Sequence, residues 1–213
     1  NLRSHEWPVH TPLPIKCYGC AAASIGNHEL ICVGGYNNQN RVLSTVQIYN
    51  LKTKSWTELH STKLMTPRAY CCCVTVSRTT TTKSPRTTKS SSSSSSSGRN
   101  AGVLVYVLGG MGRGSKVLNS VEVLDLSLSP LQRQWTTKGL PRLKSARAGC
   151  AAAVVTTMME DNDTLHHHIY IAGGYNGQTV LDTCEVFDAT TTNNNETTHP
   201  PSPPPMLYAR WCP

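Results

Sequence analysis

Charged residues are scarce in this chain, at 15% of 213 residues, compared with about 25% in typical globular proteins. Hydrophobic residues are also few, at 38%, below the usual share of about 45–50%, which also counts Gly. Ser, Thr, Asn, Pro and Gly make up the difference, and this composition disfavours a helical bundle, which needs many Leu, Glu, Lys and Ala. No apolar run is close in length to a membrane-spanning helix, which needs about 18–20 residues, so we expect no membrane partner.

The chain also lacks an initiating Met, a signal-peptide pattern and an even set of cysteines. It begins with Asn1, so we expect either a processed N-terminus or a piece of a longer protein. It contains nine cysteines, whereas secreted disulfide frameworks usually have an even number. Cys71, Cys72 and Cys73 are consecutive in an apolar run, which is poor geometry for disulfides. We interpret the cysteines as reduced thiols that act as small core residues, which predicts a reducing, cytoplasmic location.

The excess of positive charge is concentrated in one segment. The formal net charge is +8, but five basic residues and no acid fall between Ser77 and Asn100, within a tract rich in Ser and Thr. A basic low-complexity tract of this kind is typical of a solvated loop. We therefore predict no specific nucleic-acid partner.

Three diglycines mark an internal repeat. Each follows a short apolar run that is rich in β-branched or aromatic residues. Each run is too short for a buried helix, so it predicts a buried strand. The diglycines are Gly34 and Gly35 after the run 30–33, Gly109 and Gly110 after 104–108, and Gly173 and Gly174 after 169–172.

A second set of residues recurs downstream at nearly constant distances. A strand pattern places Gln47, Glu122 and Glu185 at 12, 12 and 11 residues after the second glycine of their units. Two units continue with a Trp and then, 12 residues later, an Arg. These residues are Trp56 with Arg68, and Trp135 with Arg147. The register predicts units of four short strands, with the diglycine after the second strand.

This pattern resembles the kelch repeat, whose signature is a diglycine, a Glu–aromatic–Asp cluster, a Trp and then Met-x-x-x-Arg. The chain departs from the signature at Gln47, which replaces the Glu, at Leu124, which replaces the aromatic residue, and in the third unit, which lacks its Trp. The resemblance implies an all-β fold: about three four-stranded blades of a β-propeller, with partial flanking blades. Blades stack around an axis because one blade cannot bury both of its faces alone.

The resemblance also implies structural roles for the repeat residues. The diglycines allow close backbone approach, the Trp side chains pack between blades, and the Arg side chains pair with Glu122, Glu185 or backbone carbonyls at blade junctions. These structural residues are Gly34, Gly35, Gly109, Gly110, Gly173, Gly174, Trp56, Trp135, Arg68, Arg147, Glu122 and Glu185.

We place both ends of the sequence inside blades. The expected order is the end of a preceding blade at 1–16, repeat 1 at 17–64, repeat 2 at 65–140 with an insert at 77–100, repeat 3 at 141–205 with inserts at 156–165 and 190–205, and the start of a following blade at 206–213. Because the end blades then lack neighbours, we expect further blades or a second copy of the chain as a partner.

The irregular segments all fall on one predicted rim of the propeller. In kelch topology, the loops between strands 2 and 3 share one rim with the blade-to-blade loops, and the remaining loops share the other rim. The inserts lie on the second rim, while the first rim keeps its regular spacing. Long polar loops cost little closure entropy and are tolerated where they obstruct nothing. The regular rim is therefore the better candidate for a binding face.

Side chains shortly after the diglycines are the predicted partner-binding residues. Core packing does not require Tyr, Asn, Gln or Arg there, and interface hot spots favour Tyr and Arg. The resemblance to kelch-like ubiquitin-ligase adaptors implies that residues after the diglycine contact a substrate peptide. The predicted contact residues are Tyr36, Asn37, Gln39, Arg41, Met111, Arg113, Tyr175, Asn176 and Gln178. The exposed Arg side chains favour an acidic peptide or loop as the protein partner.

The sequence predicts a binding module and not an enzyme. The favoured function is the substrate-recognition propeller of a cullin-RING ubiquitin-ligase adaptor. A galactose-oxidase-like or carbohydrate-binding propeller, or an actin-binding kelch protein, stays open as an alternative. The segment 109–116 resembles a phosphate loop, but its Lys and Ser are in the wrong order.

We also expect no metal site and no cofactor. His166, His167 and His168 are interpreted as a loop end before a strand. Adjacent strand residues point to opposite faces, and no Cys or acid stands at ligand spacing from these histidines in the sequence.

Overall fold

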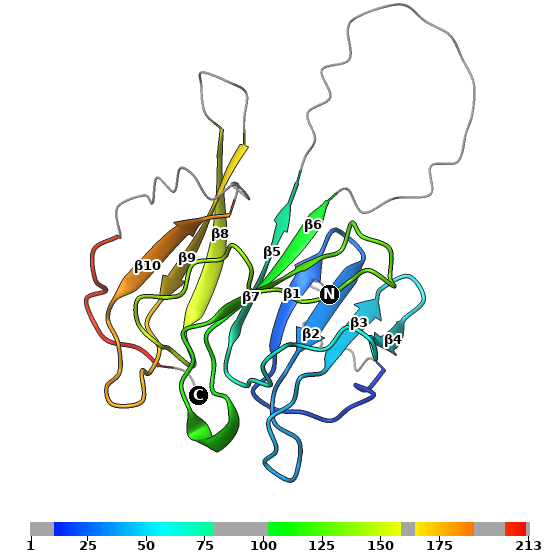
Figure 1. Cartoon of the computed structure of the whole chain (residues 1–213), viewed down its shortest axis with the longest axis horizontal. Coiled ribbons are helices and arrows are strands. Elements are labelled where there is room, and N and C mark those ends of the chain that lie inside the picture. The colour runs from blue at the N-terminus through cyan, green and yellow to red at the C-terminus, as the bar shows by residue number, and fades with distance from the viewer. Residues whose placement is uncertain (1–10, 79–101, 159–164, 190–202, 212–213) are drawn as a thin grey trace, which may run out of the picture.

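The structure is a computed structural model that describes residues 11–78, 102–158, 165–189 and 203–211. Its regular elements are strands in three antiparallel sheets (Figure 1), apart from η1, a 3₁₀ turn at Arg113–Ser115. Among these residues there is no helix with the length and apolar character that crossing a membrane requires.

Each sheet is one blade, built from consecutive strands. Blade 1 contains β1 (Ala21–Ile25), β2 (Glu29–Val33), β3 (Val46–Asn50) and β4 (Ser55–Glu58). Blade 2 contains β5 (Cys72–Ser77), β6 (Val103–Leu108) and β7 (Val121–Asp125). Blade 3 contains β8 (Ala151–Met158), β9 (Leu165–Ala172) and β10 (Cys184–Asp188). Within each sheet the strands lie in chain order, as in the blades of a propeller. The predicted all-β propeller fold is confirmed.

The outer edges of blades 2 and 3 are shorter than predicted. Only blade 1 has four strands among the described residues. In blade 2 the expected outer strand near Trp135 is reduced to one bridge, in which Val123 and Thr136 exchange hydrogen bonds of 2.9 and 3.0 Å. Trp135 itself is buried in the core. The outer edge of blade 2 is therefore held by packing of the Trp135 ring and by this one bridge, and not by a full fourth strand.

The expected inserts have mixed outcomes. Those at 77–100 and 190–205 lie mostly outside the described residues. The expected insert at 156–165 is shorter than predicted, because β8 continues to Met158 and β9 already begins at Leu165. The expectation that the three histidines end a loop was therefore wrong, since residues 166–168 belong to β9.

The hydrophobic core lies between the blades. One cluster joins β2 of blade 1 to β6 of blade 2 and includes Ile31, Val105 and Trp135. A second cluster joins blades 2 and 3 and includes Leu108 and Phe187. Because β6 lies in the middle blade, all of its residues are buried. Blade 3 has no neighbour over part of its far face among the described residues, and its strand β8 leaves several side chains exposed.

Backbone hydrogen bonds join each blade to the next repeat. The second glycine of each diglycine donates its N–H to the carbonyl of the Arg that begins the following unit. These bonds are Gly35 to Arg68 at 2.9 Å, Gly110 to Arg147 at 2.8 Å and Gly174 to Arg210 at 2.8 Å. The first glycine is also constrained: Gly34 has φ of +64°, and a Cβ there would lie 2.1 Å from the Arg68 carbonyl oxygen. No residue other than Gly fits this approach.

Candidate functional site

The loops that follow the three diglycines emerge at one end of the molecule, opposite the end of β5 and the start of β6 (Figure 1). We call this end the diglycine rim, and define it by residues 36–42, 111–118 and 175–181. The residue after each diglycine is held by a two-way backbone pairing with the loop that enters the same blade. These pairs are Tyr36 with Tyr18, Met111 with Ala69 and Tyr175 with Ala148, with N···O distances of 2.7 to 3.0 Å. The three rim loops therefore start from the same rigid geometry.

Two of the rim loops enclose a hollow of about 500 Å³ between blades 1 and 2. Tyr36 and Arg41 line it from blade 1, and Arg113 lines it from η1 in blade 2. Both Arg side chains are exposed, and none of the described lining residues is acidic. The structure thus brings three of the predicted contact residues together in one positively charged hollow.

Tyr36 belongs to an aromatic cluster on this rim. Its ring centroid lies 5.5 Å from that of Tyr18 and 5.9 Å from that of Tyr70. Burial, together with the neighbouring Tyr hydroxyls, raises the pKa of Tyr36, so its hydroxyl stays protonated and can donate at neutral pH. The Tyr18 hydroxyl donates to Asn40 Oδ1 at 2.6 Å. Sequence reasoning missed Tyr18, Tyr70 and Asn40, although the first two lie on the blade-to-blade loops of the favoured rim.

Two predicted contact residues shape their own loops. The Asn37 side-chain oxygen accepts hydrogen bonds from the backbone N–H groups of Gln39 and Arg41, at 3.0 and 2.9 Å. The Asn176 oxygen accepts in the same way from Gln178, at 2.8 Å, and from the next residue. Side chains that bond their local backbone stabilise tight loops. These two Asn oxygens therefore position the rim, and only their amide N–H groups are left to face a partner.

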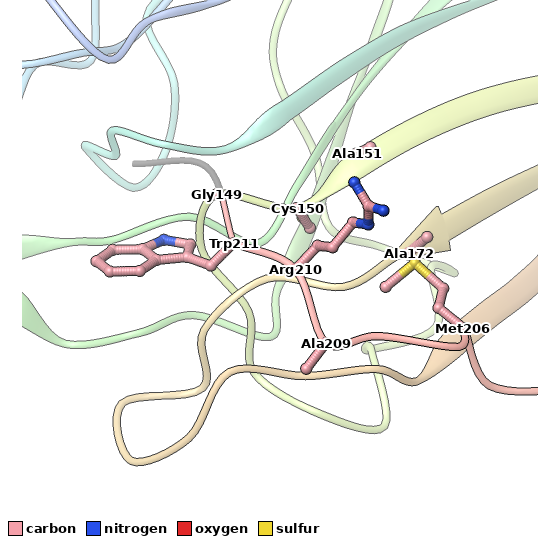
Figure 2. A pocket seen from close by; sticks show the side chains of 8 residues that line it. All are labelled: Gly149, Cys150, Ala151, Ala172, Met206, Ala209, Arg210 and Trp211. Atoms are coloured by element: carbon pink, nitrogen blue, oxygen red, sulfur yellow. The ribbon is translucent and has the colours of Figure 1, made fainter.

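The predicted contact residues of blade 3 lie apart from the hollow between blades 1 and 2. The Tyr175 ring packs on Trp211 with a centroid distance of 5.2 Å. Trp211 borders a second hollow of about 510 Å³, shown in Figure 2, which is also lined by Cys150, Met206 and Arg210. Arg210 is exposed, and no carboxylate in the described part of the chain forms an ion pair with it.

Buried Arg–Glu pairs hold the start of blades 2 and 3. Arg68 Nη2 lies 2.5 Å from Glu122 Oε1, and neither side chain is exposed to solvent. Arg147 and Glu185 repeat this pair in blade 3, also at 2.5 Å. Each Arg also donates to backbone carbonyls of its own blade, as from Arg68 Nη1 to Gly109 O at 2.8 Å. The predicted pairing of these residues is confirmed, and it gives them a structural role at blade junctions.

Blade 1 carries no such ion pair at the corresponding place. Gln47 takes the position of the Glu, and its side-chain oxygen accepts from the Ile15 backbone N–H at 3.0 Å. Cys17 takes the position of the Arg, because it immediately precedes Tyr18, which forms the bridge to the rim residue as Ala69 does in blade 2.

Three thiols gather beside this position. The Sγ atoms of Cys17, Cys20 and Cys32 all lie within 4.8 Å of one another. A hydrogen bond from Cys32 lowers the pKa of Cys20 to about 6. Burial raises the pKa of Cys17 to about 11, and the bond to Cys20 strongly raises that of Cys32. The sequence signal for this cluster was the spacing Cys17-x-x-Cys20, which the sequence analysis did not use.

The histidines of β9 also lie beside an acid. His166 and His168 share one face of the strand, and Asp188 of β10 stands opposite His168 in the strand register. The three side chains offer ligand atoms within 4.8 Å of one another, and His166 Nδ1 lies 3.6 Å from Asp188 Oδ2. The expectation that no acid accompanies the histidines was wrong, because a neighbouring strand supplies it.

Comparison with known proteins agrees with the repeat architecture. The Kelch motif matches residues 16–61 and 164–192. Kelch-like protein 41b of Danio rerio is 38% identical over 64 residues, which cover 30% of this chain and 10% of that protein. The aligned part thus spans about a tenth of the length of this curated relative. Kelch repeats are generally non-catalytic units that mediate protein–protein binding.

The first match begins at the loop that enters blade 1 and includes all four of its strands, and the second covers β9 and β10 of blade 3 but not β8. Blade 2 lies between them and repeats the same diglycine geometry. The chain therefore contains kelch repeats and resembles the kelch-like proteins, and these repeats support a propeller module for protein interaction.

Proposed function

We propose that the diglycine rim receives an acidic segment of another protein, and that the chain is the substrate-recognition propeller of a cullin-RING ubiquitin-ligase adaptor. The observation that carries the proposal is the hollow lined by Tyr36, Arg41 and Arg113 from two different blades. A site shared by two blades exists only in the assembled propeller, as expected for recognition of a folded or extended partner segment.

The charge of the rim favours an acidic partner. Arg41, Arg113 and Lys116 are exposed on the loops 36–42 and 111–118, and these two loops contain no Asp or Glu. An Arg guanidinium can fork onto a carboxylate with two parallel hydrogen bonds. The Tyr36 ring supplies the rigid apolar contact that hot spots usually contain.

The adaptor role is supported by the resemblance to kelch-like proteins, and we propose a cytoplasmic location for it. The partner-binding set contains all nine residues predicted from the sequence, with Tyr18, Tyr70 and Asn40 added from the geometry of the rim. Met111 and Tyr175 contribute from the neighbouring loops, while Asn37 and Asn176 hold those loops in shape.

We further propose that more propeller blades, or a second copy of the chain, cover the open face of blade 3. The Arg210 carbonyl oxygen already accepts a hydrogen bond from the Gly174 N–H, as the carbonyl oxygens of Arg68 and Arg147 do from the preceding diglycines. In those two repeats the Arg side chain pairs with a Glu of the blade that it begins. A following blade would supply that Glu to Arg210 and would cover the hollow of Figure 2.

Selection from a random peptide library on the immobilised chain tests the binding proposal. We expect enrichment of peptides that contain Asp and Glu, and a loss of about thirtyfold in affinity for Tyr36→Ala, which corresponds to about 2 kcal/mol for a hot-spot residue. Arg41→Ala with Arg113→Ala should also abolish selection of the acidic peptides.

The matched control removes the same charge from the other rim. Lys52→Ala with Lys54→Ala changes two exposed basic residues in the turn between β3 and β4, and should leave peptide affinity unchanged. Equal loss in the control, or peptides without acidic residues, would contradict the proposed site. The adaptor role is tested separately with the full-length protein, from which Tyr36→Ala should release the substrate while a cullin scaffold is still recovered.

A further inference from the structure

The three thiols of blade 1 form a compact group with a shape suited to a metal ion. Cys17 and Cys20 flank a two-residue turn, and Cys32 reaches them from the neighbouring strand β2. Within the turn, Gly19 has φ of +61°, the left-handed conformation that lets a Cys-x-x-Cys segment bend back on itself. Cys32 is 5% exposed, and the other two side chains are half-buried.

Comparison of the three repeats shows that two of these thiols are particular to blade 1. Cys20 has counterparts in the other blades, because Cys71 and Cys150 also directly precede the first strand. Cys17 stands where the others have a buried Arg. Cys32 lies opposite Gln47 in the β2–β3 register, whereas apolar residues lie opposite the corresponding Glu. Those apolar residues are Val107 opposite Glu122 and Ile171 opposite Glu185.

The three differences change the chemistry of the position together. Blade 1 loses a buried guanidinium at Cys17 and the carboxylate that would balance it at Gln47, so no ion pair is left half-formed. In the same place it gains a second and a third sulfur beside the thiol that every blade has. A lone change at any one of these positions would leave an unpaired charge or an isolated thiol.

We propose that Cys17, Cys20 and Cys32 form a thiolate site for one zinc ion. Zinc binds Cys sulfur at about 2.3 Å in tetrahedral geometry, which places two sulfur ligands about 3.8 Å apart. The three Sγ atoms, all within 4.8 Å of one another, need only small side-chain rotations to reach that spacing. Binding releases the remaining thiol protons to solvent. The fourth position is left to a water molecule or to a donor from a partner.

A zinc ion here would act on the diglycine rim. Gly35 lies against the cluster, since a Cβ on it would be 3.1 Å from the Cys20 Cβ and 3.2 Å from the Cys17 Cβ. The next residue is Tyr36, which lines the rim hollow. The metal would therefore replace the Arg–Glu pair as the cross-link that holds the start of blade 1 beneath the binding loop.

The test uses the reduced, purified chain with Co²⁺ as a spectroscopic substitute and Zn²⁺ as a competitor. Thiolate ligands give tetrahedral Co²⁺ an intense near-ultraviolet charge-transfer absorption, which the sulfur-free cluster of His166, His168 and Asp188 does not produce. We expect one equivalent of Co²⁺ per chain with this absorption, displaced by one equivalent of Zn²⁺. Cys32→Ser should weaken zinc binding by at least about tenfold.

Two variants separate metal binding from folding. Cys17→Arg, Cys32→Val and Gln47→Glu together copy the arrangement of blade 2, so this triple variant should keep the wild-type circular dichroism spectrum and lose the thiolate absorption. Cys71→Ala removes the blade 2 counterpart of Cys20 and should leave cobalt binding unchanged. A wild-type chain without the absorption, a triple variant that retains it, or a reduced chain that forms a disulfide instead of taking up metal overturns the proposal.

Discussion

Replacing Glu122 by Gln tests whether a buried ion pair holds the junction between blades 1 and 2. The Glu122 carboxylate accepts hydrogen bonds from Arg68 Nη2 at 2.5 Å and from the backbone N–H groups of Met65 and Thr66 at 2.8 and 2.9 Å. A Gln amide has one oxygen, so its NH₂ group would face at least one of these donors. The Arg68 guanidinium, which is not exposed, would also lose its counter-charge.

The expected cost is about 3–5 kcal/mol in the free energy of unfolding, the range for removing one partner of a buried ion pair. Typical domains have a total stability of only about 5–15 kcal/mol, so the loss should be large in a urea titration followed by far-ultraviolet circular dichroism. Glu58→Gln is the control, because its ion-pair partner His60 is exposed. That change should stay within about 0.5 kcal/mol of the wild type.

A double variant separates charge from packing. Arg68→Met with Glu122→Gln removes both charges and so approximates blade 1, where Cys17 and Gln47 stand at these positions. No buried charge is then left unpaired, so the double variant should lose less stability than Arg68→Met and Glu122→Gln do in sum. Additive losses, or a Glu122→Gln chain within about 1 kcal/mol of the wild type, would refute the reasoning.

Three further predictions concern Gly109, Trp135 and His167. Gly109→Ala should destabilise the chain strongly, because the new methyl group would lie 2.3 Å from the Arg147 carbonyl oxygen. In the control Gly114→Ala the new methyl group meets nothing within 4 Å, so this change should cost only about 1–2 kcal/mol for its left-handed φ. Melting temperatures of the two variants measure the difference. Trp135→Ala should cost about 3–5 kcal/mol in urea unfolding, and Trp135→Phe less, since the buried indole nitrogen has no hydrogen-bond partner. Burial lowers the pKa of His167, so the unfolded chain binds this proton more tightly and stability should fall as the pH drops below about 6.5; His167→Gln should show a smaller fall in a matched pH series.

The sequence predicted the fold well because the features that define it are local and periodic. A diglycine after an apolar run specifies a strand end at which another backbone approaches closely, and Gly34 and Gly109 are used in this way. The Arg–Glu pairing was predictable as well, since its two members recur in register in two units and a buried charge needs a partner.

Parts of the sites were beyond sequence reasoning because they depend on register between strands. Asp188 stands beside the histidines only because β10 pairs with β9 at His168, and no spacing along the chain encodes that proximity. Cys32 joins Cys17 and Cys20 for the same reason. The length of the outer strand of blade 2 was also not predictable from the sequence. Burial of the Trp135 ring is compatible with either a full ladder or the single bridge observed.

The hydrogen bonds from each diglycine to the following Arg carbonyl set the order in which the chain can be completed during synthesis. The Gly35 N–H lacks its acceptor until Arg68 has been made, and the Gly110 N–H lacks its acceptor until Arg147 has been made. At roughly 5–20 residues per second, blade 1 would spend about 0.5–2 seconds, and blade 2 about 1–4 seconds, with this end unsatisfied after its last described strand has been made. Each blade thus completes its hydrogen bonds only when the start of the next repeat has been made. A chain shortened between Gly174 and Arg210 would leave the Gly174 N–H of its last blade permanently without this acceptor.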